Sequence, residues 1–385
     1  MASSYKKKKT GLVLTGGGAR AAYQVGVLKA VCRFLPAAHN PFHIISGTSA
    51  GAINAATLAI NASDFHRGVR RLNMVWRNFE VHHVFRADTW GLLKTGMHWM
   101  AALTFGGLGR HNPESLLDRK PLLKLLHEYL DFSQIQRAID DGYLDALSIT
   151  ASGYNSGQSV SFFQGLPELQ KWHRVRRLGV PAEIGIPHLM ASSAIPFLFK
   201  AERINREYFG DGSMRQTAPL SAALHLGSDR LLVIGVNNEH TTEERKPAEL
   251  YPSLAKIAGH VLNSIFLDSL DSDIERLHRI NLTLQQANKG RITRPKIGLR
   301  HVDALVISPS QDIGAIANQF IHRLPRPLRL LLRGVGAINH DDSSFVSYLM
   351  FDRTFCRELI SLGYADAMQK KEELQGFLES HIRNS

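Results

Sequence analysis

Cysteine is scarce in this chain, with only Cys32 and Cys356 among 385 residues. Two cysteines cannot build the disulfide framework that holds small secreted proteins together. This excludes a small protein stabilised by disulfides and leads us to expect a reducing compartment.

Long apolar runs are scarce as well. The best charge-free stretch, 44–62, is rich in Gly, Ser, Thr, Asn and Ala, which suit a packed helix better than a bilayer span. Behind the basic cluster Lys6–Lys9, only Leu12–Leu14 precede three glycines, which is too short for a signal-peptide core. We therefore expect a soluble cytoplasmic protein, with peripheral contact to a membrane left open.

Acidic residues are fewer than basic ones, 34 against 46, which gives a formal net charge of +12. Such a balance favours nucleic acid, acidic metabolites or an anionic lipid surface. Nucleic acid is not expected, because aromatic residues make up only 8% and few are interleaved with basic ones. The segment Arg326–Arg333 mixes arginine with leucine, which is typical either of an interfacial segment on an anionic membrane or of a solvated helix with one buried side. The oligomeric state cannot be predicted.

The remaining composition, 44% hydrophobic and 21% charged, is that of a globular protein. Twice in the first 60 or so residues an apolar run leads through a glycine turn into a helical pattern, which predicts a parallel α/β sheet. The predicted strands are 11–15, 42–46, 146–151, 159–163, 230–236 and 302–307. The predicted helical regions after the first two are 116–130, 254–284, 313–322 and 345–362.

The stretch Trp90–Gly109 is aromatic, glycine-rich and nearly uncharged. It is typical either of a buried helix pair or of an apolar lid over a lipid site.

Gly47-Thr48-Ser49-Ala50-Gly51 matches a nucleophile elbow, in which a serine sits on a sharp turn between strand and helix. Gly47 and Gly51 leave room for that turn, and the following helix directs its N-terminal N–H groups towards a developing oxyanion. Ser49 is therefore the candidate nucleophile.

Gly16-Gly17-Gly18-Ala19-Arg20 also lies between a predicted strand and a predicted helix. It lacks the Lys-Ser/Thr ending of a P-loop and the third glycine of a dinucleotide site. Successive glycine N–H groups can instead form an oxyanion hole. Arg20 either holds this loop or contacts a phosphate head group.

A serine hydroxyl needs a base. Seven histidines follow in the order that a Ser-Asp-His triad requires: His225, His240, His260, His278, His301, His322 and His340. None of these histidines lies in a sequence pattern typical of a catalytic turn. Asp211, in contrast, lies between Gly210 and Gly212, and it becomes an effective base if burial raises its pKa. The groups His82-His83 and His340-Asp341-Asp342 lack the spacing of a closed metal site, so neither a metal nor a cofactor is expected.

Taken together, the glycine loop 16–20, the elbow 47–51 and Asp211-Gly212 resemble the three signatures of patatin-like phospholipases. The segments 191–197 and 211–220 are similar to that family too, and the resemblance runs from Lys9 to about Val236. One residue departs from the pattern: Ser213 follows Asp-Gly where the family usually has Gly or Ala, and its hydroxyl could compete for Asp211.

The resemblance implies a three-layer α/β/α sandwich with a mainly parallel central sheet and a mostly helical C-terminal extension. It implies a catalytic domain over 10–240 and a C-terminal region over 241–385 packed on it, whereas the lysine run itself predicts a solvated basic tail over 1–9. It further implies a lipid acyl hydrolase with Ser49 as nucleophile, Asp211 as base and Gly16–Gly18 as the oxyanion hole. A Ser-His esterase or acyltransferase of another α/β family remains the alternative.

Overall fold

The computed structural model describes residues 8–36, 39–86, 115–238, 269–289, 299–334 and 344–382. The stretch 90–109, predicted as a helix pair or a lid, lies outside these residues, as do 254–268 of one predicted helix. Among the helices within these ranges, none combines the length and the hydrophobicity needed to cross a bilayer.

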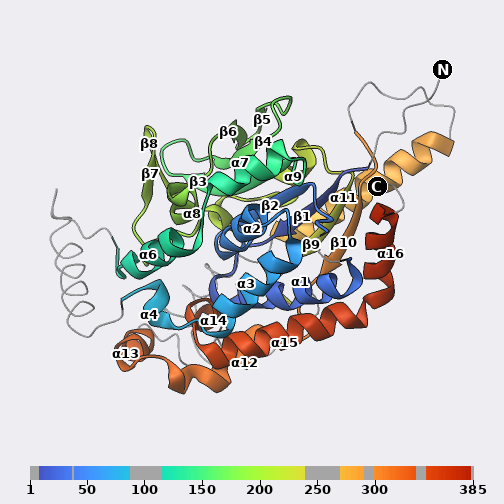
Figure 1. Cartoon of the computed structure of the whole chain (residues 1–385). Coiled ribbons are helices and arrows are strands. Elements are labelled where there is room, and N and C mark those ends of the chain that lie inside the picture. The colour runs from blue at the N-terminus through green and yellow to red at the C-terminus, as the bar shows by residue number, and fades with distance from the viewer. Residues whose placement is uncertain are drawn as a thin grey trace, which may run out of the picture.

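A ten-stranded mixed sheet forms the middle layer of the molecule (Figure 1). Its order is β10-β9-β1-β2-β3-β4-β6-β5, with β8 joined to β3 and β7 joined to β8. Neighbouring strands from β10 to β3 are all parallel, so this half of the sheet is the one built from strand–helix crossovers. The strands are β1 Thr10–Leu14, β2 Ile44–Thr48, β3 Ala146–Gly153, β4 Ser159–Gly165, β5 Trp172–Arg174, β6 Arg177–Pro181, β7 Glu202–Ile204, β8 Glu207–Asp211, β9 Arg230–Ile234 and β10 Asp303–Ile307.

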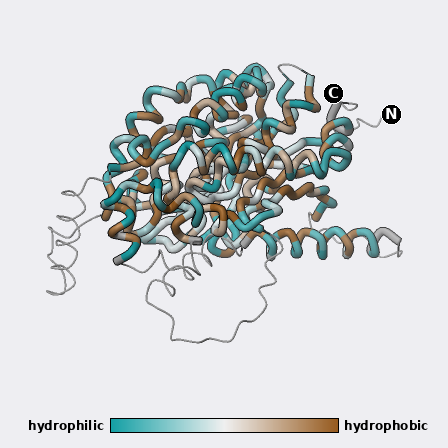
Figure 2. The backbone as a smooth tube through the Cα atoms, turned by 90° about the horizontal axis from the view of Figure 1, so that it is seen from below, coloured by the Kyte–Doolittle hydropathy of each residue, from teal (hydrophilic) through white to brown (hydrophobic). Residues whose placement is uncertain are grey.

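Helices cover both faces of the sheet. Successive side chains of a strand point to opposite faces, so Leu12 and Leu14 join the larger hydrophobic core while Val13 joins the smaller one. The smaller core also takes side chains from α9 and α11, and the other helices pack on the larger core. The backbone coloured by hydropathy shows apolar segments gathered in the interior (Figure 2). The helices are α1 Ala22–Phe34, α2 Ala50–Ile60, α3 Phe65–Arg77, α4 Val81–Val84, α6 Lys120–Tyr129, α7 Ser133–Asp140, α8 Ile186–Ser192, α9 Ser221–His225, α11 Ser269–Lys289, α12 Ile313–Phe320, α13 Arg326–Gly334, α14 Ser344–Leu349, α15 Arg353–Gln369 and α16 Lys371–Ile382.

The chain beyond residue 240 contributes to both the sheet and the larger core. β10 pairs in parallel with β9 and extends the sheet by one strand. α15 lies along α1, where the Tyr23 hydroxyl donates to Asp366 Oδ2 at 2.9 Å. The C-terminal part therefore shares the hydrophobic core with the N-terminal part.

The predicted α/β sandwich and the six predicted strands are confirmed, with shifts of one or two residues at several ends. The predicted helix 345–362 is instead divided into α14 and α15 at Met350–Asp352, because the Asp352 side chain caps α15 by accepting from the N–H groups of Thr354 and Phe355. The short strands β5 to β8 were not predicted.

Candidate active site

Ser49 stands at the turn between β2 and α2. Its φ of 55° lies in the left-handed region, which is unusual for a residue other than glycine and marks a sharp, strained turn. A Cβ atom at Gly47 would lie 2.5 Å from the carbonyl oxygen of Gly51, and one at Gly51 would be equally close to that of Leu14. Both glycines are therefore needed for the backbone to fold this tightly.

The sheet register explains how Asp211 reaches a residue far away in the sequence. β2 pairs with β3 as far as Thr48, opposite Thr150. β8 continues along β3 in the opposite direction, with Asp211 opposite Ala151. Because β4 occupies the other edge of β3, the C-terminal ends of β2 and β8 meet head to head. Ser49 and Asp211 therefore leave the sheet next to each other.

Asp211 is completely buried and holds the Ser49 hydroxyl. Ser49 Oγ donates to Oδ2 of Asp211 at 2.6 Å, and the backbone N–H of Ser213 donates to Oδ1 at 2.9 Å. Burial raises the pKa of Asp211 to about 6, although hydrogen bonding from Ser49 and Ser213 and the charge of Arg119 lower it. The pair can thus pass the hydroxyl proton to a carboxylate whose affinity for it is above that of an ordinary aspartate. The Ser213 hydroxyl also hydrogen-bonds Asp211 and lowers its pKa, and Ser49 nevertheless keeps its bond of 2.6 Å to Oδ2.

The glycine loop lies against this pair. A Cβ atom at Gly16 would collide with the Ser213 hydroxyl and lie 3.1 Å from Ser49 Cβ. Gly18 has a φ of +54° and lines the same pocket as Ser49. Within the part of the chain that the structure describes, the N–H groups of Gly16, Gly17 and Gly18 have no hydrogen-bond acceptor. They are available to a negatively charged oxygen.

Arg20 is 4% exposed and turns towards the C-terminal region. Its Nε donates to Ser347 Oγ at 2.6 Å, and its guanidinium lies 4.4 Å from the centre of the Tyr348 ring. A further donor reaches Asn237, just beyond β9, at 3.3 Å. Of the two predicted roles for Arg20, these contacts favour the one in which it holds the glycine loop.

Two residues whose hydrogen bonds fix the backbone around the site were not identified from the sequence. The Ser192 hydroxyl accepts from the Ser49 N–H at 2.8 Å and donates to the Thr150 carbonyl at 2.6 Å, which ties the elbow to β3. The buried Arg119 donates to the carbonyls of Met190 and Lys200, each at 2.7 Å, and so fixes the segment between α8 and β7. Ser192 lies in a segment that the family resemblance marks, but Arg119 carries no local signal.

The histidines considered as bases lie elsewhere. His225 donates from Nδ1 to the Ser221 carbonyl at 2.7 Å and stacks on Trp172, on the side of the smaller core. His278, His301 and His322 are exposed, whereas Ser49 and Asp211 are buried. None of these four hydrogen-bonds Ser49 or Asp211, and His240, His260 and His340 lie outside the described residues.

An apolar pocket starts at Ser49 and runs between α2, α3 and α6. Its polar lining includes the hydroxyl groups of Ser49 and Ser193, together with Arg71 and Tyr129, where Arg71 donates to the Tyr129 carbonyl at 2.9 Å. Between Ser49 and Thr57, both of which line it, α2 rises by about 12 Å, at 1.5 Å per residue. Most of the other lining residues are apolar: Ala50, Ile53, Leu72, Val75, Trp76, Phe79, Val84, Leu122, Leu125, Leu126, Leu130, Ile195, Phe199 and Phe351. Such a pocket suits a long apolar chain that ends at the Ser49 hydroxyl.

Comparison with protein families gives one match. The model of the patatin-like phospholipases matches residues 12–224, which include the glycine loop, Ser49 and Asp211. No curated protein sequence matches the chain significantly.

The solved structures that are similar to this chain at low identity include the following two. VipD from Legionella pneumophila is 13% identical, with a TM-score of 0.39 over 98% of this chain and 67% of that chain. The human GIVD cytosolic phospholipase A2, solved with methyl gamma-linolenyl fluorophosphonate inhibitor and terbium chloride, is 14% identical with a TM-score of 0.40. That comparison covers 98% of this chain and 60% of the human chain, so this chain spans less than two thirds of its length.

Proposed function

Because the chain belongs to the patatin-like phospholipase family, we propose that it is a serine hydrolase of fatty-acyl esters in phospholipids, lysophospholipids or related lipids. Family membership supports lipid hydrolysis in general terms. The observation that carries the finer proposal is the hydrogen bond of 2.6 Å from Ser49 Oγ to Asp211 Oδ2 beside an apolar pocket.

The proposed reaction has two steps. Asp211 accepts the Ser49 proton while Oγ attacks the ester carbonyl, and the same proton passes to the departing alcohol as its C–O bond breaks. Water then attacks the acyl group on Ser49 and gives a proton to Asp211. The fatty acid leaves when the bond to Oγ breaks, and Oγ regains that proton.

The glycine loop is proposed to stabilise the charge that develops on the carbonyl oxygen. The N–H groups of Gly16–Gly18, without acceptors among the described residues, support this role. Donors of this kind are worth the most in a site that excludes water, as a pocket lined mainly by leucine and aromatic side chains does.

The pocket between α2, α3 and α6 is proposed to hold the acyl chain. Each methylene group that leaves water there contributes about 0.8 kcal/mol. Such a pocket selects for long acyl chains and leaves the head group outside it.

The proposed organisation is a catalytic domain over 10–240 and a C-terminal region over 241–385 that supports it. The hydrogen bond between Arg20 and Ser347 supports this role, because it joins the last residue of the glycine loop to α14. The C-terminal region would then hold the oxyanion loop in place.

The test is to replace Ser49 with alanine and to measure fatty-acid release from a panel of lipids of differing head group and chain length. We expect release by the wild-type protein and none above background by Ser49→Ala, with unchanged thermal unfolding. Replacing each of the seven downstream histidines one at a time tests the Ser-His alternative, and loss of activity at one of them with Asp211 dispensable would favour it. Full activity of Ser49→Ala would refute both.

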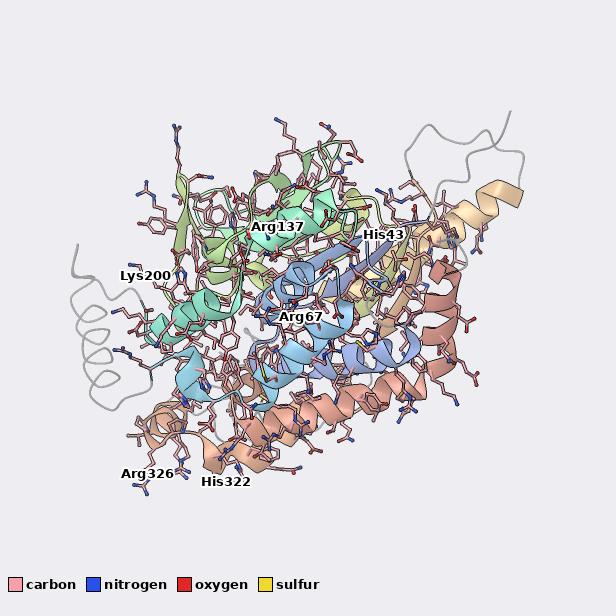
Figure 3. All side chains as sticks on the ribbon, viewed as in Figure 1. His43, Arg67, Arg137, Lys200, His322 and Arg326 are labelled. Atoms are coloured by element: carbon pink, nitrogen blue, oxygen red, sulfur yellow. The ribbon has the colours of Figure 1, made fainter. Side chains whose placement is uncertain are left out.

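We further propose that the protein works at the cytoplasmic surface of an anionic membrane. Leu328 and Leu332 of α13 are buried, whereas Leu330 is 71% exposed and Arg326 and Arg333 face solvent. Figure 3 shows Arg326 projecting from the edge of the molecule together with His322. Because the apolar side of α13 is already packed, contact would be mainly electrostatic.

Vesicle flotation tests this contact. We expect the protein to float with vesicles that contain anionic lipid at low salt and to be released as the salt concentration rises. Flotation that is independent of anionic lipid, or none at any salt concentration, would refute it.

A further inference from the structure

A second pocket lies on the other side of Phe351, between α4, the 3-10 helix η4 (Ile321–Arg323) and the start of α15. Its cavity volume is about 570 Å³, which is ample for a polar group together with water. Its apolar lining comes from Val81, Phe85, Leu324, Pro325 and Phe351, and its ionisable lining from Glu80, His82, Arg86, Arg323, Asp352 and Arg353. Figure 1 shows α4 near α13, the helix that follows η4.

The two carboxylates of this pocket are already engaged. Oδ1 of Asp352 accepts from the N–H groups of Thr354 and Phe355 at 2.9 and 3.1 Å, so its charge is directed to the N-terminus of α15. Glu80 lies at the start of α4, 3.3 Å from His82 and 3.7 Å from Arg353. Neither acid neutralises Arg86 or Arg323.

The three arginines come from separate segments and keep unused donors. Arg323 is exposed and has no hydrogen bond or ion pair with any residue that the structure describes. Arg86 is 63% exposed, and its ion pair with Asp118 is 4.0 Å long, which is too long for a hydrogen bond. Arg353 is 59% exposed, and its pair with Glu80 is longer than a hydrogen bond.

We propose that this pocket binds a phosphate group through Arg323 and Arg353, with Arg86 at its rim. Guanidinium groups match the oxygen edges of phosphate bidentately, and three of them around one pocket match a dianion better than a single carboxylate. The phosphate belongs either to a lipid head group or to a small soluble compound. This site is separate from Ser49, so the proposal does not depend on the function proposed above.

Full-length Ser49→Ala protein is suitable for the test, since it cannot consume a lipid probe. Calorimetric titration with inorganic phosphate and with glycerol phosphate measures the soluble source. Flotation with phosphatidylcholine vesicles, with and without phosphatidic acid, measures the lipid source. The pocket variant adds Arg323→Gln and Arg353→Gln. The matched control adds Arg67→Gln and Arg137→Gln, which remove the same charge from α3 and α7, at a distance from the pocket (Figure 3).

We expect the pocket variant to bind phosphate at least about tenfold more weakly than the control, because it loses charge-assisted hydrogen bonds to the phosphate oxygens. Binding of the soluble probes that only the pocket variant loses supports a small phosphate compound. Binding of phosphatidic acid vesicles alone, lost in the same variant, supports a lipid head group. Equal loss in both variants, or no binding of any probe by Ser49→Ala protein, would overturn the proposal. Thermal unfolding of each variant checks that these exposed substitutions leave the fold intact.

Discussion

Phe351 separates two pockets of opposite character. On one side, an apolar pocket has few polar lining groups, one of them the Ser49 hydroxyl bonded to a buried carboxylate. On the other, a pocket carries three arginines, a histidine and two acids, most of them open to solvent. Charges are strong where water is excluded and weak where water and salt screen them. The first pocket should therefore lose its function when one atom changes, and the second only when several charges are removed.

The largest effect is expected from Asp211→Asn. Asparagine keeps the shape of the side chain but cannot take the Ser49 proton, so we expect kcat/KM for ester hydrolysis to fall by about 10²–10⁴-fold. Initial rates on a soluble short-chain ester measure this without interference from membrane binding. A fall of less than threefold would show that Asp211 is not the base.

The stability of Asp211→Asn relative to the wild-type protein should increase with pH. The folded-state pKa of Asp211 is about 6 and the unfolded value is 3.8, so the folded wild-type protein loses stability as pH rises from about 4 to about 6. The difference corresponds to about 3 kcal/mol above pH 6. Asparagine does not ionise, so Asp211→Asn should be more stable relative to wild type at pH 8 than at pH 4. Denaturant unfolding at both pH values measures this and also shows that the variant is folded.

Gly16→Ala should give the next largest loss. The added methyl group would press on the Ser213 hydroxyl and lie 3.1 Å from Ser49 Cβ, which displaces the proposed oxyanion donors. Loss of one such donor costs about 10²–10³-fold in kcat. Gly376→Ala in α16 is the matched control, because its added methyl group meets nothing within 4 Å. Equal activity of the two variants would remove Gly16 from the site.

Each part of the site that was predicted from the sequence is marked by a short pattern of neighbouring residues. Gly16–Gly18 and the elbow around Ser49 each lie between an apolar run and a helical pattern, and Asp211 stands between two glycines. Likewise, β1 and β2 were predicted because buried parallel strands are continuous apolar runs.

What the sequence did not predict depends on long-range pairing. β8 is five residues long and ends at Asp211, and its place beside β3 follows only from the register. Arg119 reaches carbonyls more than 70 positions away, and nothing around it in the sequence distinguishes it from a surface arginine. Both pockets share Phe351, which lies in a break between two helices where one continuous helix was predicted.

The pH dependence of wild-type activity should show a moderate effect. Only the deprotonated Asp211 can accept the Ser49 proton, so kcat/KM should rise about tenfold per pH unit at low pH and level off above about 6. The profile should be recorded on an uncharged ester, so that the substrate itself does not titrate. A midpoint near 4 would indicate an ordinary, solvated aspartate and would contradict the burial of this pair.

The smallest effect, and the most direct test of the division between the pockets, is expected from Phe351→Ala. Removing this ring joins the apolar pocket to the polar one and admits water beside the acyl chain, so each added methylene group should contribute less than about 0.8 kcal/mol. We expect kcat/KM for long-chain esters to fall several-fold and that for short-chain esters to stay within about threefold. Phe351→Leu is the control, because leucine keeps an apolar wall, whereas the alanine variant should also lose about 3–5 kcal/mol of stability and be assayed at low temperature. If both variants show the wild-type dependence on chain length, Phe351 does not seal the acyl pocket.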